Sequence, residues 1–182
     1  MDNDFPMRIL ETERLILRQF TSDDAGFIFE LLNEPSFIQN IGDRGVRNTS
    51  DAEMYIERGP VVSYARFGFG LYLVQLKESR ASIGMCGLIK RDSLDDVDIG
   101  YAFLPKFWSK GYAVESASAV MAYARDVIGL KRIIAITDPD NQGSIRVLEK
   151  LGFKYEKMIR LSADDIELKL FAADDLRNHS NG

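Results

Sequence analysis

Short runs of branched and aromatic apolar residues predict β-strands along most of the chain. These runs cover residues 15–20, 69–77, 83–90, 97–104, 131–137, 153–161 and 166–171. Short polar turns separate the runs at 69–77, 83–90 and 97–104, so we expect these three strands to form an antiparallel meander. The last two runs are also close in sequence and predict a closing hairpin.

Apolar residues three or four positions apart predict about four helices between these strands. Residues that favour helix starts and residues that end helices set their bounds. The first helix runs from Thr21 or Ser22 to Pro35, and the second from Thr49 or Ser50 to Gly59 and Pro60. The third covers residues 114–128, and the fourth runs from Asn141 to Gly152. The fold class is therefore α/β (α+β), with a mixed, mostly antiparallel sheet of about six or seven strands. We expect a single domain at 1–174 and a flexible C-terminal tail at 175–182.

Composition and charge narrow the class of protein. Of 182 residues, 46% are hydrophobic and 28% charged, and no apolar run approaches the roughly 20 residues of a membrane helix. A net charge of −5 and a pI near 5.0 argue against a nucleic-acid partner and favour a cationic one. Because the acidic N-terminus has no signal-peptide pattern, we expect a cytoplasmic protein without a membrane partner.

One cysteine and one histidine exclude several catalytic classes. Cys86 lies in an apolar run and is interpreted as a buried, inert thiol, so neither an intrachain disulfide nor a cysteine-rich zinc site is expected. His179 lies in the polar tail, which disfavours Ser-His-Asp and Cys-His mechanisms and a histidine-bound metal. We expect no metal site.

The segment from Asp98 to Ala113, DIGYAFLPKFWSKGYA, predicts a strand that leads through a glycine turn directly into a helix. The first turn of a helix offers free backbone N–H groups and a positive dipole end, which together suit a phosphate. Gly111 and Ala113 let the backbone approach an anion closely, and Lys110 adds positive charge. Taken alone, the segment is weak evidence, because a glycine before a helix is more often a plain turn than a phosphate site.

Three segments together resemble the GNAT family of acyl-CoA-dependent N-acetyltransferases, in its subgroup similar to ribosomal-protein-alanine N-acetyltransferases. They are LETERLILR from Leu10, GYAFLPKFWSKGYAVESA from Gly100 and NQGSIRVLEKLGF from Asn141. Their order agrees with the predicted strands and helices. The resemblance implies a sheet that splays between the strands at 97–104 and 131–137, with the pantetheine arm of acetyl-CoA inserted in the gap.

The resemblance also implies which residues bind acetyl-CoA as cosubstrate. Phe103 and Leu104 would supply backbone partners for the pantetheine arm. The other expected cofactor-binding residues are Trp108, Ser109, Lys110, Gly111, Tyr112, Ala113, Asn141 and Ser144. The family's turn usually begins with Gln or Arg, whereas this chain has Trp108, so backbone amides must bind the pyrophosphate with less help from side chains.

A second departure from the family concerns the proton donor. Many members place a tyrosine as general acid where this chain has Leu148. Ser144 lies four residues earlier on the same helix, and its hydroxyl is the candidate catalytic acid. A structural role for Ser144 at the helix start is the alternative, with water as the proton source.

The preferred general base is Asp98, because a strand running into the splay can direct a carboxylate or its bound water toward the amine. Glu30 and Glu34, near the end of the first helix, are the other candidates. A solvated surface carboxylate is the alternative interpretation for all three. Glu115 would stabilise the positive end of the motif helix.

An aromatic cluster accompanies the motif and is interpreted mainly as core packing. Its members are Tyr101, Phe103, Phe107 and Trp108, and Trp108 is also a candidate for the wall of the cofactor channel.

The expected activity is direct acetyl transfer from acetyl-CoA to a primary amine, of a protein N-terminus or a small molecule, in a ternary complex. The alternatives are a noncatalytic acetyl-CoA-binding sensor or interaction domain, which Leu148 favours, and a simple nucleotide-binding domain. The sequence does not select the amine, and the oligomeric state stays open between a monomer and a homodimer.

Overall fold

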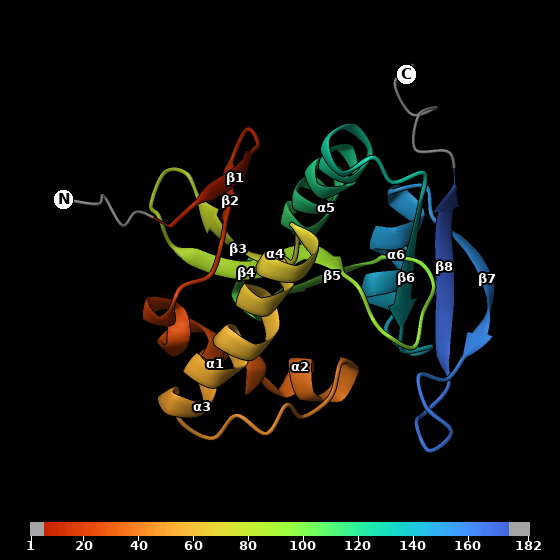
Figure 1. Ribbon diagram of the computed structural model, residues 1–182, viewed down its shortest axis with the longest axis horizontal. Coiled ribbons are helices and arrows are strands. Elements are labelled where there is room, and N and C mark those ends of the chain that lie inside the picture. The colour runs from red at the N-terminus through yellow and green to blue at the C-terminus, as the bar shows by residue number, and fades with distance from the viewer. Residues whose placement is uncertain (1–5, 175–182) are drawn as a thin grey trace.

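The central feature of the computed structural model is one sheet with the strand order β1-β2-β3-β4-β5-β6-β8-β7 (Figure 1). The structure describes residues 6–174, so His179 and the tail expected at 175–182 lie outside the described residues. The strands are β1 (Arg8–Glu11), β2 (Leu15–Arg18), β3 (Leu71–Leu76), β4 (Ser82–Ile89), β5 (Asp98–Phe103), β6 (Arg132–Thr137), β7 (Lys154–Ile159) and β8 (Leu168–Asp174). Neighbouring strands are antiparallel except β5 and β6, which confirms the predicted mixed, mostly antiparallel sheet.

The N-terminal segment adds a strand that the sequence pattern did not predict. LETERLILR, residues 10–18, holds the end of β1 and all of β2, two antiparallel strands between which a tight turn reverses the chain. The backbone N–H of Thr12 donates to the Leu15 carbonyl at 3.0 Å, and the Leu15 N–H donates to the Thr12 hydroxyl at 3.0 Å. Within residues 6–174 the sheet therefore has eight strands, where about six or seven were expected.

Helices cover both faces of the sheet, and Figure 1 shows α5 above it and α1, α2 and α3 below. The helices are α1 (Ala25–Leu32), α2 (Pro35–Asn40), α3 (Thr49–Ile56), α4 (Val62–Phe67), α5 (Tyr112–Tyr123) and α6 (Gln142–Lys150), and the short turns are η1 (Ser22–Asp24), η2 (Glu57–Val61), η3 (Pro105–Phe107) and η4 (Ala124–Ile128). One buried layer joins α5 and α6 to side chains such as Val74 and Ile99. The other joins α1, α2 and α3 to Leu73 and Met85.

Two prolines act differently from the prediction. Pro35 was expected to end a helix, but α1 has already ended at Leu32 and Pro35 is the first residue of α2, where its missing N–H costs no helical hydrogen bond. Gly59 and Pro60 were expected to stop the next helix, but the chain continues through the π-helical turn η2 into α4. The π-helical turn changes the hydrogen-bond spacing at Pro60, which has no backbone N–H to donate. The helix ends only at Gly68, which has φ 77°.

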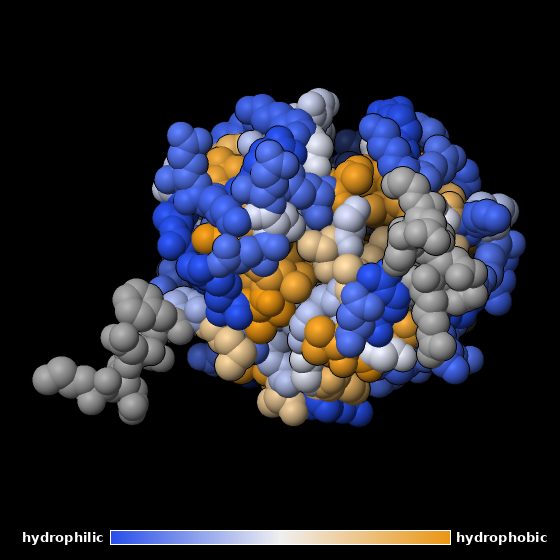
Figure 2. All heavy atoms as spheres, turned by 90° about the horizontal axis from the view of Figure 1, so that it is seen from above, coloured by the Kyte–Doolittle hydropathy of each residue, from blue (hydrophilic) through white to orange (hydrophobic). Residues whose placement is uncertain are grey.

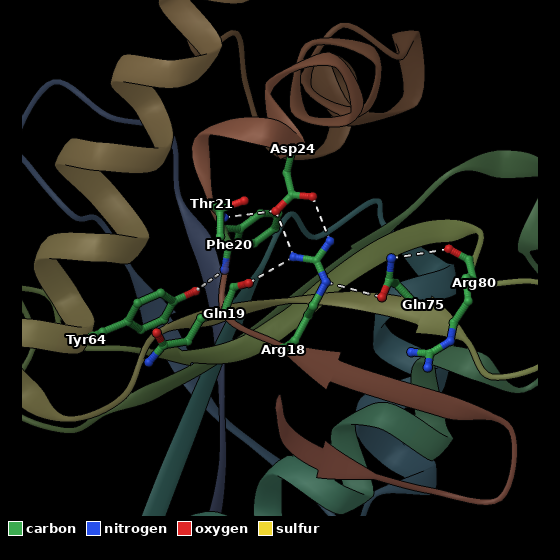
Figure 3. A network of polar contacts seen from close by, with 8 residues as sticks. All are labelled: Arg18, Gln19, Phe20, Thr21, Asp24, Tyr64, Gln75 and Arg80. Carbon is green, nitrogen blue, oxygen red and sulfur yellow. Dashed lines mark hydrogen bonds and ion pairs between the residues drawn. The ribbon is translucent and has the colours of Figure 1, made fainter. Parts of the chain in front are cut away.

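A polar network anchors the start of α1 to the sheet (Figure 3). Arg18 donates to both carboxylate oxygens of Asp24 at 2.8 Å each, and the two side chains are only 14% and 9% exposed. Arg18 also donates to the Gln19 carbonyl at 3.0 Å and to the Gln75 side chain at 3.2 Å. The Thr21 N–H donates to Asp24 at 2.9 Å. This ion pair therefore fixes the turn between β2 and α1.

The upper face of the molecule is mainly polar. Figure 2 shows hydrophilic atoms over most of the upper face, with apolar atoms near its middle. Between residues 6 and 174, no helix combines the length and apolar character that a crossing of the bilayer requires.

The predicted splay lies between β5 and β6. These parallel strands share one register position, where Asp98 faces Ile134, and the Ile134 N–H donates to the Val97 carbonyl at 3.1 Å. By contrast, β5 pairs with β4 over its whole length, from Asp98 to Phe103. The two strands therefore meet at one end and separate toward Phe103 and Thr137.

Candidate active site

A cleft of about 1230 Å³ is lined by residues from both sides of the splay. One group comes from β5, from the end of β6, from the turn before α5 and from α6; the other comes from α2, α3, η2 and α4. Of the residues predicted from the sequence, the cleft is lined by Asp98, Phe103, Trp108, Ser109, Gly111, Tyr112, Ala113, Asn141 and Ser144. The fold therefore brings together segments as far apart in sequence as Glu34 and Lys150.

The turn before α5 has the backbone shape that the glycine pattern predicted. Gly111 is the N-cap of α5 with φ 82°, and Ser109 also has a positive φ, 59°. The first helical hydrogen bond runs from the Glu115 N–H to the Gly111 carbonyl at 3.0 Å, so the preceding N–H groups have no partner within the helix. The Trp108 indole donates to the Phe103 carbonyl at 2.8 Å and holds the turn against the end of β5.

Leu104 and Lys110 do not line the cleft, unlike the other predicted cofactor residues. The Leu104 side chain is buried, its N–H donates to Ile83 at 3.0 Å, and its carbonyl accepts from Phe107 at 2.9 Å. The Leu104 N–H is therefore already paired, whereas the Leu104 carbonyl, like the Phe103 carbonyl that accepts from Trp108, has one hydrogen bond and can accept a second. The role of both residues toward the pantetheine arm stays a prediction. Lys110 is exposed, with its ammonium 5.9 Å from the centre of the Phe107 ring.

Glu115 links the first turn of α5 to the turn between β1 and β2. It accepts hydrogen bonds from the Thr12 hydroxyl at 2.6 Å, from the Arg14 N–H at 2.9 Å and from the Arg14 guanidinium at 2.7 Å. Desolvation opposes ionisation, but these hydrogen bonds outweigh it and lower the pKa of Glu115. The Arg14 guanidinium also stacks on Tyr112, 4.4 Å from the ring centre, and so braces the helix start.

Ser144 lies in the first turn of α6 beside a tyrosine hydroxyl. The Asn141 side chain caps α6 by accepting from the Ser144 N–H at 3.1 Å. The Tyr101 hydroxyl lies 3.0 Å from Ser144 Oγ and donates to the Ser144 carbonyl at 3.2 Å. Burial raises the pKa of Tyr101, so its hydroxyl keeps its proton at neutral pH. Leu148 is 1% exposed and does not line the cleft.

Asp98 is buried at the closed end of the splay. Its Oδ2 accepts from the Arg91 guanidinium at 2.7 Å, whereas its Oδ1 is buried without a hydrogen-bond partner. Burial raises the pKa of Asp98, and the charge and hydrogen bond of Arg91 oppose this rise. Ile99 packs in the α5 layer and Ala102 in the α1–α3 layer, so strand alternation places Asp98 on the side of α1–α3.

The two glutamates named as alternative bases differ in position. Glu34 precedes α2 and lines the cleft, whereas Glu30 is exposed on α1 and does not line it. In the part of the chain that the structure describes, no group of His, Cys, Asp and Glu side chains is arranged to hold a metal ion. The polar groups that line the cleft are carboxylates, hydroxyls, side-chain amides, backbone groups and basic side chains.

Cys86 is completely buried on β4, and burial raises the pKa of its thiol to about 12. At pH 8 only about 0.01% of the thiol would be ionised, which leaves almost no nucleophile. We expect the native protein to resist iodoacetamide for hours and the unfolded protein to react within minutes, as measured by intact mass. Cys86→Ala should keep most of its activity. Acetyl trapped on Cys86 during turnover would contradict this expectation.

Sequence reasoning did not find the contacts that Tyr101 and Arg91 make. Tyr101 was interpreted with the aromatic core, yet its hydroxyl meets a side chain 43 residues away. Such a contact leaves no local pattern in the sequence. Arg91 lies seven residues before Asp98, across the turn between β4 and β5, and the acidic residues in that turn offered several other partners.

Comparison with known proteins agrees with this geometry. The model of the acetyltransferase (GNAT) domain matches residues 14–154. The chain is 33% identical over 154 residues to the uncharacterized N-acetyltransferase YoaA of Bacillus subtilis, with 84% of this chain and 86% of YoaA covered. The crystal structure of a GNAT-family acetyltransferase from Bacillus anthracis matches with a TM-score of 0.76 at 26% identity, covering 92% of this chain and 98% of that one.

The fold is also shared with more distant enzymes. RimL, a ribosomal L7/L12 α-N-protein acetyltransferase solved in complex with coenzyme A, matches with a TM-score of 0.79 at 19% identity, covering 94% of this chain and 99% of that one. Members of this family are acyltransferases that use acetyl-CoA and act on amines. The match over residues 14–154 and the identity to YoaA show that this chain belongs to the GNAT family of acetyltransferases.

Proposed function

We propose that the protein transfers an acetyl group from acetyl-CoA directly to a primary amine, of a protein N-terminus or a small molecule, in a ternary complex. The observation that carries the proposal is the cleft at the β5–β6 splay, which joins the α5 turn to the start of α6. Both substrates can then meet between the separated strands. The proposal includes a cytoplasmic location, where acetyl-CoA and new polypeptide N-termini are both available.

The turn from Trp108 to Ala113 is the proposed pyrophosphate site. Its support is the positive φ of Gly111 and the run of N–H groups without helical partners at the start of a helix of 12 residues. The indole bond from Trp108 to Phe103 holds this turn in place without a side-chain donor to the phosphate. Asn141 and Ser144 would border the same ligand from the start of α6.

Asp98 is the proposed base for the attacking amine. Its unpartnered Oδ1 can accept an N–H of the acceptor, while Oδ2 stays fixed by Arg91. The raised pKa of Asp98 improves a carboxylate as a proton acceptor near neutral pH. Because Asp98 and Ser144 lie on different elements of one cleft, proton removal from the amine and proton delivery to the thiolate can use separate groups.

Ser144 and Tyr101 are proposed to return a proton to the departing thiolate. We expect Ser144→Ala to lower kcat about tenfold while changing the acetyl-CoA Kd less than twofold, since water can replace the hydroxyl in part. Tyr101→Phe should give a similar loss, and the double variant should lose no more than the larger single effect. Ser118→Ala, on the exposed side of α5, is the control. An unchanged kcat in both single variants, with chemistry rate-limiting, would assign the acid to solvent.

A turnover assay tests the function as a whole. Purified protein is mixed with acetyl-CoA and a panel of amines, and free thiol and acetylated amine are both measured. An acetyltransferase releases both in equal amounts. The second candidate is a noncatalytic acetyl-CoA sensor, which the buried Leu148 in place of a tyrosine favours. A sensor would show an acetyl-CoA-dependent rise in melting temperature with no thiol release across the panel.

A further inference from the structure

Unpaired arginines gather in the cleft. Most arginines between residues 6 and 174 form an ion pair with a carboxylate. Those without such a pair are Arg44, Arg58, Arg66, Arg80 and Arg146. All of these line the cleft except Arg80, which lies in the turn between β3 and β4. Arg146 lies on α6, whereas the other three lie on the opposite, α2–α4 side.

Arg44, Arg58 and Arg66, which line the α2–α4 side of the cleft, are called the basic wall below. Arg44 comes from the loop between α2 and α3, Arg58 from η2, and Arg66 from α4. Arg58 and Arg66 are eight residues apart, about two helical turns, and Val62 between them also lines the cleft. Glu34 is the carboxylate on this side of the cleft that has no ion pair. The wall therefore carries net positive charge in a chain whose net charge is −5.

Arg91 and Asp98 line the cleft together with the basic wall. Arg44, Arg91 and Tyr55 all line the cleft, and the charges of the two arginines oppose the rise that burial causes in the pKa of Tyr55. Arg91 in turn holds Asp98, a residue of the cleft lining whose Oδ1 is buried without a hydrogen-bond partner. The three arginines of the basic wall therefore line the same cleft as a residue with one buried, unpartnered acceptor oxygen. This arrangement is complementary to an amine and an anion carried by the same molecule.

We propose that the acceptor carries a carboxylate or phosphate close to its primary amine, and that Arg44, Arg58 and Arg66 bind this anionic group while Asp98 receives the amine. The proposal rests on the acetyltransferase function proposed above and names the chemical class of its substrate. Guanidinium groups suit it because their planar donors match carboxylate and phosphate oxygens. The anionic group would hold the amine at Asp98, at the closed end of the splay, and select against neutral and basic amines.

The experiment compares matched acceptors. Peptides Ala-Asp-Ala-Ala and Ala-Asn-Ala-Ala, both with amidated C-termini, test a carboxylate, and phosphoethanolamine against ethanolamine tests a phosphate. We expect kcat/KM to be about tenfold higher for the anionic member of at least one pair, and the preference to shrink as salt is raised, since exposed charge pairs are individually weak and screened. The pair with the larger ratio identifies which anion is bound.

Arginine variants test whether the preference for anionic acceptors comes from the basic wall. The triple variant Arg44→Gln, Arg58→Gln, Arg66→Gln should lower the anionic-to-neutral ratio to about one while keeping the rise in melting temperature with CoA, which shows that it is folded. Arg80→Gln, an arginine that is also unpaired but lies outside the cleft, should keep the wild-type ratio. A ratio near one in the wild-type protein, or an unchanged ratio in the triple variant, overturns the proposal.

Failure of this inference and failure of the proposed function give different results. Equal turnover of neutral and anionic amines refutes the anionic acceptor and leaves the acetyltransferase function intact. If no amine releases thiol, binding decides: calorimetric titration of the same four probes into CoA-loaded protein should still show about tenfold tighter binding of an anionic member. Equal affinities in that titration refute the basic wall as an anion site.

Discussion

Gly111→Val is expected to abolish the rise in melting temperature that acetyl-CoA gives the wild-type protein. At a ligand concentration of 100 times Kd, that rise should be about 5–10 °C for a domain of this size. Gly111 has φ 82°, a conformation that a β-branched residue adopts only under strain, and an added Cβ would lie 3.3 Å from the Arg14 guanidinium. The valine methyl groups would also stand at the helix start where the pyrophosphate is proposed to bind.

Gly129→Val is the matched control. Gly129 also has φ 82°, ends η4 instead of beginning α5, and has no atom within 4 Å of an added Cβ. Both variants should melt at a lower temperature than the wild-type protein because both carry the same backbone strain. Only Gly111→Val should lose the acetyl-CoA response in differential scanning fluorimetry. A full response in Gly111→Val would remove the α5 turn from the cofactor site.

The second large effect is on stability. Arg18→Ala should lower the free energy of unfolding by about 3 kcal/mol, because it leaves the buried carboxylate of Asp24 without its counter-charge. The two side chains are 14% and 9% exposed, and the guanidinium also satisfies the Gln19 carbonyl and the Gln75 side chain (Figure 3). For a domain of this size, the melting temperature should fall by about 6–12 °C.

Arg47→Ala provides the comparison at the surface. Arg47 also makes two hydrogen bonds to one carboxylate, Asp43, but these side chains are 58% and 48% exposed. Exposed pairs contribute little, so Arg47→Ala should change the free energy of unfolding by less than about 1 kcal/mol in urea titrations. Equal losses in the two variants would mean that burial does not determine the contribution of the Arg18 pair.

The strands and the motif helix could be predicted because their signals are local. Residues 69–104 carry dense apolar runs with polar turns, and the meander of β3, β4 and β5 follows from them. Proline is less informative, since it starts a helix as readily as it ends one: Pro35 opens α2, and Pro60 is accommodated in η2. β1 was missed because four residues, two of them charged, make too weak a strand pattern.

The candidate site was predictable only where it follows one continuous segment. The turn from Trp108 to Ala113 needs φ above zero at Gly111, and a glycine before a helix is a visible sign of that. The partners of Asp98 and Ser144 come from other strands and turns, so their identity depends on the sheet register. The basic wall is assembled from a loop, a π-helical turn and a helix, and its unpaired charge becomes apparent only when every other ion pair is known.

The single meeting point of β5 and β6 divides the backbone hydrogen bonds of the sheet into two blocks, β1 to β5 and β6, β8 and β7. Few backbone bonds resist separation of these blocks, so their connection relies on side-chain packing through α5 and α6. A molecule that bonds to both strands acts as a crosslink between the blocks. Occupancy of the splay therefore sets how cooperatively the protein unfolds, in addition to the temperature at which it does so.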